Sequence, residues 1–176
     1  MNPKTDYFLN CMDPGGDTGM SLFHIGPTEF ELIDSATIPY DPRSRDKERM
    51  PTAKLIQWTT EHLGRHELLY EDFHLRNNSA DKDTTALRVI GSIDQLLYDH
   101  DIFTAVHTQE PVEAKHMATD EVLERLGLHM GHAHAQRHVR DSIRHAVTYL
   151  TRRSYLPLCR IAYPRGGGVR TRSHPG

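Results

Sequence analysis

Apolar runs separated by short turns occupy the first part of the chain and predict three strands. The first run covers residues 6–13 and ends at the turn formers of 14–16, and two further runs cover 19–25 and 29–34. The turns between these runs are too short for a crossover connection. We therefore expect the three strands to pair with one another in antiparallel order.

Helical and strand patterns alternate after a polar, proline-punctuated loop at 39–51. Short apolar runs predict two buried parallel strands, over 67–73 and 102–107. Apolar positions at helical spacing predict helices over 52–64, 84–100 and 132–152, and a short helix is expected over 119–126. This order of elements predicts an α/β fold, in which a mixed five-stranded sheet of three antiparallel strands followed by parallel strands is flanked by helices.

The charge of the chain is unevenly distributed. The formal net charge is -3, yet residues 142–176 hold seven arginines and no acidic residue, which leaves 14 basic and 24 acidic residues before them. A length of 176 residues suits one domain, which we place at 1–154, followed by a basic, flexible tail at 155–176 that is rich in proline and glycine. Such a tail suits contact with a phosphate backbone, and a merely solubilising end is the alternative.

The cysteines and the hydropathy pattern indicate the compartment. Cys11 and Cys159 are far apart and form neither a disulfide framework nor a zinc-binding pair, so a reducing, cytoplasmic environment is expected. No apolar stretch approaches the roughly 20 residues of a membrane span, and we expect no membrane association.

Three acidic residues fall at the ends of elements that we expect to meet. Asp13 closes the first strand, Glu71 closes the fourth, and Asp141 lies in the last helix. Adjacent carboxylates repel one another unless a cation neutralises them, and oxygen ligands of this kind suit Mg²⁺ or Mn²⁺. His138 lies one helical turn before Asp141 on the same face, where it could bind a second ion or move a proton.

Four blocks of sequence stand in a familiar order: DPGGDTG at 13–19, YEDF at 70–73, PVEAK at 111–115 and HVRD at 138–141. Together they resemble the motifs of the RuvC-type Holliday-junction resolvases, a family with an RNase H-like fold. The resemblance implies that Asp13, Glu71, His138 and Asp141 are catalytic metal ligands and that Lys115 is a catalytic contact to the cleaved strand. It also implies a structure-selective DNA endonuclease that uses two Mg²⁺ or Mn²⁺ ions to cut four-way junctions or other branched DNA, and that works as a homodimer through the helix at 84–100.

The sequence also departs from that family. The glycine-rich run that follows the lysine is replaced by residues 117–131, so a second catalytic lysine is not assigned, and Ser142 stands where the family has alanine. These departures indicate a divergent member, which we interpret as phage-encoded and which would act in the cytoplasm of a bacterium or of a phage-infected host cell.

Three alternatives stay open. Within the nucleases, an RNase H-type enzyme or a flap or fork nuclease would use the same metal chemistry. The histidines also form a stripe at helical spacing, His134, His138 and His145 with Asp141, which could hold zinc. A protein that binds branched DNA without cutting it is the alternative outside the enzymes.

Overall fold

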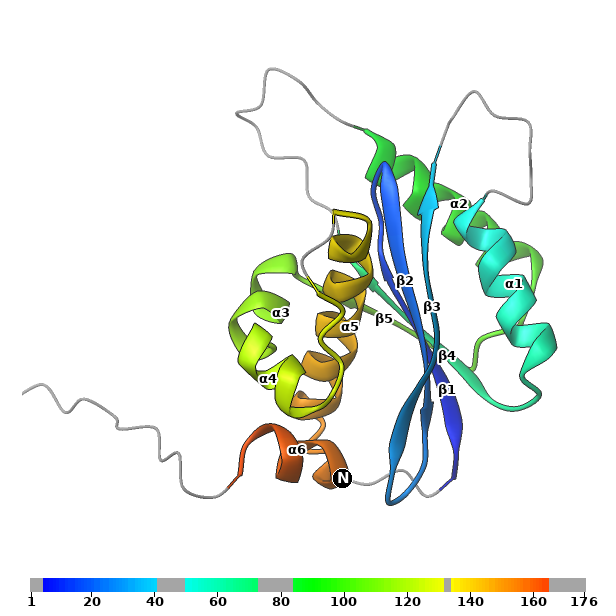
Figure 1. Ribbon diagram of the computed structural model, residues 1–176. Coiled ribbons are helices and arrows are strands. Elements are labelled where there is room, and N and C mark those ends of the chain that lie inside the picture. Colours follow the sequence, from blue (N-terminus) through cyan, green and yellow to red (C-terminus); the bar gives the residue numbers. More distant parts are fainter. Residues whose placement is uncertain (1–4, 41–49, 73–83, 132–133, 165–176) are drawn as a thin grey trace, which may run out of the picture.

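A mixed sheet of five strands forms the centre of the molecule (Figure 1). The computed structural model describes residues 5–40, 50–72, 84–131 and 134–164. Strands β1 (Tyr7–Asp13), β2 (Asp17–Ile25) and β3 (Phe30–Pro39) pair in antiparallel order, and β4 (His66–Glu71) and β5 (Ala105–Gln109) add in parallel beside β1. The sheet order is β3-β2-β1-β4-β5, which confirms the predicted fold class.

Helices cover both faces of the sheet (Figure 1). On one face lie α1 (Pro51–Glu61) and α2 (Thr85–Asp99). On the other lie α3 (Pro111–Met117), α4 (Asp120–Arg125), α5 (His134–Arg152) and α6 (Leu156–Ala162).

Strand β4, between β1 and β5, shows why two separate cores form. Leu68 and Tyr70 pack with the core under α1 and α2, whereas Leu69 between them packs with the core under α5. Successive side chains of a strand point to opposite faces, and a parallel strand covered on both faces is therefore apolar throughout. The helix α5 turns its predicted apolar stripe to the sheet, and Ile143, Ala146 and Val147 are fully buried.

Several predicted boundaries need correction. Strand β3 continues to Pro39, five residues beyond the predicted end, because it pairs with β2 along its whole length. The helix α3 was not predicted, since its seven residues are too few to show a clear helical period.

The predicted start of the flexible tail at residue 155 is wrong. Tyr155 is buried, and its hydroxyl donates to the backbone carbonyl of Gly26 at 2.8 Å. Leu158 and Ala162 of α6 are fully buried in the core under α5. These buried side chains pack the segment against the domain, and the remainder of the predicted tail, 165–176, lies outside the described residues.

Within the described parts of the chain, no helix combines the length and the apolar character that crossing a membrane requires.

Candidate active site

Two carboxylates meet where β1 and β4 end. The two strands run in parallel with Met12 opposite Tyr70, so the next residues, Asp13 and Glu71, reach the same edge of the sheet. Both side chains are mostly buried, with exposed fractions of 14% and 17%. The structure therefore brings together two acids that are 58 positions apart in the sequence, as the ends of the predicted strands suggested.

The helix α5 adds His145 to this pair. Its imidazole is 1% exposed, with Nε2 at 2.8 Å from Oε2 of Glu71 and Nδ1 at 3.0 Å from Oε1 of Gln109. One ligand atom from each of Asp13, Glu71 and His145 lies within 4.8 Å of the other two. Two carboxylates and an imidazole at this spacing form a group that could hold a metal ion, and we call it the carboxylate–histidine cluster.

The sequence motifs did not predict His145 in this cluster, although the residue belongs to the histidine stripe. The signal was its position four residues after Asp141, which puts both on one face of the helix. The helical spacing could not predict Gln109 as the partner of His145, because Gln109 is a neutral residue at the end of β5 and belongs to no motif.

The imidazole of His138 lies on the other side of Asp13. Its Nδ1 is 3.3 Å from Oδ2 of Asp13, and the ring is 28% exposed. The hydrogen bond to Asp13 raises the pKa of His138 above its ordinary value, against the effect of partial burial. His138 therefore gains a stronger hold on its proton from the carboxylate it contacts.

The ionised form of Asp13 is unfavourable in this site. Burial raises the pKa of Asp13, and the neighbouring charges of Glu71 and Asp141 raise it further, while the hydrogen bond from His138 lowers it. A buried carboxylate beside two others is unfavourable unless positive charge is brought to it. A divalent cation bound here would supply that charge.

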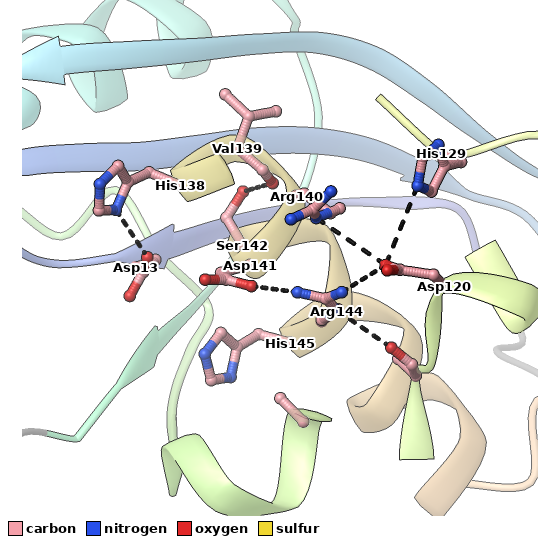
Figure 2. A network of polar contacts seen from close by, with 12 residues as sticks. Asp13, Asp120, His129, His138, Val139, Arg140, Asp141, Ser142, Arg144 and His145 are labelled. Carbon is pink, nitrogen blue, oxygen red and sulfur yellow. Dashed lines mark hydrogen bonds and ion pairs between the residues drawn. The ribbon is translucent and has the colours of Figure 1, made fainter. Parts of the chain in front are cut away.

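Asp141 stands beside the cluster and has its own cationic partner (Figure 2). The guanidinium of Arg144, 13% exposed, donates to Asp141, to Asp120 of α4 at 2.5 Å and to the carbonyl of Ala118 at 3.2 Å. Arg140 lies 3.9 Å from the same oxygen of Asp120. Figure 2 shows this chain of ionic contacts running away from Asp13 and His138. Asp141 is thus held from the side opposite to Asp13, an arrangement that the HVRD motif alone did not indicate.

Lys115 lies exposed on α3, which begins directly after β5. Since Gln109 at the end of β5 contacts His145, α3 starts at the same edge of the sheet as the cluster. The side chain of His134, the first member of the proposed histidine stripe, lies outside the described residues.

A glycine allows α5 to approach the sheet at this point. Gly19 of β2 is paired with Asp13, and a Cβ atom at Gly19 would lie 1.9 Å from the carbonyl oxygen of His138. Any side chain at position 19 would therefore push the start of α5, and His138 with it, away from Asp13. This contact gives a physical reason for the glycine that ends the DPGGDTG block.

The fold is RNase H-like, and more narrowly it is that of RuvC. RuvC of Thermus thermophilus matches with a TM-score of 0.59 and 17% identity, over 84% of this chain and 97% of that one. The T. thermophilus RuvC complex with a Holliday junction substrate matches with a TM-score of 0.58 and 17% identity, over 85% and 97%. No protein-family model matches the chain, and no curated protein matches it in sequence. These comparisons confirm the RuvC-like fold and the divergence that the altered motifs indicated.

Proposed function

We propose that this protein is a metal-dependent endonuclease that cleaves branched DNA, with the four-way Holliday junction as its substrate. The observation that carries the proposal is the meeting of Asp13 and Glu71 at the edge of a RuvC-like sheet, with His138 in contact with Asp13. A structural neighbour, RuvC of T. thermophilus, is described in complex with a Holliday junction substrate, which supports the choice of DNA structure.

Four residues would hold the metal: Asp13, Glu71, His138 and Asp141. Two Mg²⁺ or Mn²⁺ ions bound there would activate the attacking water and neutralise the leaving 3′ oxygen. Asp13 and Glu71 fit this role because they are carboxylates whose crowding a cation relieves. His138, which is partly exposed and contacts Asp13, would serve in one of two ways: as a neutral ring it would bind the second ion, and as a protonated ring it would exchange a proton with substrate or solvent.

Contacts to the DNA backbone would come from the basic residues around this site. Lys115 would contact the scissile phosphate. Of the arginines in the last part of the chain, Arg160 is exposed on α6 and could reach a phosphate. Arg144 belongs elsewhere, because its guanidinium is mostly buried against Asp141 and Asp120.

Cleavage of labelled DNA structures tests the proposal. The full-length protein is incubated with a four-way junction, a fork, a flap, an RNA–DNA hybrid and a plain duplex, with Mg²⁺, with Mn²⁺ or with EDTA. We expect metal-dependent cuts in the junction and none with Asp13→Asn, which should still bind the DNA. Preferred cutting of the hybrid or of forks and flaps would move the substrate to those structures. Tight junction binding without cuts under either ion would make the protein a binding module and refute the nuclease.

Two symmetric cuts in a junction require two active sites, and we propose that a homodimer supplies them. The helix α2 is the proposed interface: Val89 and Ile93 are buried in the core, whereas Tyr98 is 88% exposed. Sedimentation with and without a junction tests this. We expect Tyr98→Asp to weaken the dimer, while Ile161→Asp, at a residue 49% exposed on α6 on the other face of the sheet, should not. A monomer in both conditions that makes single nicks would contradict the proposal.

A further inference from the structure

His145 is buried in a place where a histidine would otherwise be costly. Its imidazole has a polar partner on each ring nitrogen, Oε1 of Gln109 at Nδ1 and Oε2 of Glu71 at Nε2. The ring extends from α5 to the ends of β4 and β5 and is 1% exposed. Its orientation relative to Glu71 is therefore fixed by the fold.

The partner of Nδ1 decides which nitrogen faces the cluster as a ligand. The amide oxygen of Gln109 can only accept, so Nδ1 of His145 carries the hydrogen of this bond. The other nitrogen, Nε2, faces Glu71 at 2.8 Å and is the one that can give its lone pair to an ion bound beside Asp13 and Glu71. A histidine whose one nitrogen donates to an oxygen acceptor while the other faces carboxylates has the arrangement of a metal ligand with its supporting partner. Without an ion, Nε2 donates a hydrogen to Oε2 of Glu71, and a bound cation would take the place of that hydrogen.

The spacing of the three groups also suits one ion. Two ligands bound at about 2.1 Å can lie up to about 4.2 Å apart across the ion. The ligand atoms of Asp13, Glu71 and His145 all lie within 4.8 Å of one another, so small side-chain rotations would bring them to a common cation.

We propose that His145 is a direct metal ligand of this site, that Gln109 holds it in the ligating tautomer, and that the imidazole turns the preference of the site from Mg²⁺ toward Mn²⁺. The proposal rests on the proposed metal-dependent function and adds a ligand to it. Mg²⁺ favours oxygen ligands and keeps its waters. Imidazole is a ligand of the first-row transition metals, and Mn²⁺ is the member of that row that also suits carboxylates such as Asp13 and Glu71. His138 differs from His145, because it is partly exposed and contacts Asp13 from the other side.

Calorimetric titration of the full-length protein with Mn²⁺ and with Mg²⁺ tests the ligand role. We expect His145→Gln to weaken Mn²⁺ binding at least about 10-fold and Mg²⁺ binding less, and Gln109→Met to weaken Mn²⁺ binding about 10-fold. The matched control is His107→Gln, since His107 is a partly buried histidine of β5 that contacts Glu67 instead of the cluster. If His145 only serves as a positive charge beside Glu71, its replacement should leave Mn²⁺ binding unchanged or tighten it, and either result overturns the proposal.

Pulsed electron paramagnetic resonance of the Mn²⁺-loaded protein gives a second readout that does not depend on replacing a buried residue. Nitrogen coupling from a bound imidazole should persist in His138→Gln, because His145 would still contact the ion. Loss of all nitrogen coupling in that variant overturns the proposal even if His145→Gln fails to fold. Wild-type protein that binds Mn²⁺ and cuts junctions, while His145→Gln does both equally well, removes only the role of His145. Wild-type protein that binds neither ion removes the proposed function as well.

Discussion

Replacing Asp13 by asparagine should stabilise the protein in the absence of divalent ions while it abolishes cleavage. Asp13 is mostly buried, and the charges of Glu71 and Asp141 add to the effect of burial in raising its pKa. The ionised carboxylate therefore weakens the fold at neutral pH. Asparagine has nearly the same shape and can still accept the hydrogen bond from His138, but it carries no charge.

The size of the effect follows from the spacing of the site. Oxygens of Asp13 and Glu71 lie within 4.8 Å of each other, and two unit charges at about that distance repel by about 3.5 kcal/mol at an effective dielectric constant of about 20. The charge-assisted bond from His138 becomes a neutral one, which gives up about 1–2 kcal/mol. The net gain in the free energy of unfolding is therefore about 1.5–2.5 kcal/mol, or a rise in Tm of about 3–10 °C for a domain of this size.

The sign of this gain depends on pH. A carboxyl group whose folded pKa is raised contributes stability below its unfolded pKa and loses that stability as pH rises through the folded pKa. The difference in Tm between Asp13→Asn and the wild type should therefore be present at neutral pH and disappear as pH falls toward the ordinary pKa of aspartate, about 3.9.

Thermal unfolding with and without Mn²⁺ measures both parts of the prediction. Wild-type protein should gain about 2.7 kcal/mol at an ion concentration of about 100 Kd, and Asp13→Asn should lose most of this gain. Asp101→Asn is the control for removal of an exposed charge and should change neither value. A lower Tm for Asp13→Asn without metal, or an undiminished rise with Mn²⁺, would refute the electrostatic account of the site.

Other parts of the site give three further predictions. Lys115→Ala should lower the rate of junction cleavage on the order of 10²-fold with little change in DNA affinity, as single-turnover kinetics and titration would show, because its charge matters most in the transition state. Deletion of 165–176, which contains three arginines, should weaken DNA binding. If each arginine touches a phosphate, the slope of log K against log[salt] should become shallower by up to about 2.7. An unchanged slope would show that this segment does not contact DNA. Arg144→Gln should destabilise the fold by about 3 kcal/mol because it leaves Asp141 without its cationic partner, and adding Asp141→Asn should recover much of this loss in urea unfolding. Strictly additive effects of the two changes would contradict the pairing.

The fold could be predicted from the sequence because its signals are local. Apolar runs of strand length are separated by turns at the first two connections, and α5 repeats its buried residues at helical spacing. The segment from Tyr155 to Ala162 was missed for the converse reason. Its fit to the domain depends on contacts with Gly26 and with α4, which no pattern within eight residues can show.

Only those parts of the site that depend on strand ends and on helical spacing could be predicted from the sequence. Asp13 and Glu71 could be brought together from the sequence, because parallel neighbouring strands end at one edge. The place of His145 in the cluster could not be predicted from the sequence. The helix α5 presents both Asp141 and His145 to the same edge, and the HVRD motif points to the aspartate. Neighbouring residues orient each of the two: Arg144 donates to Asp141, while Gln109 holds a nitrogen of His145 toward the carboxylates. A motif thus fixes which residues reach a site, and the contacts of each residue with its neighbours determine how its side chain is oriented there.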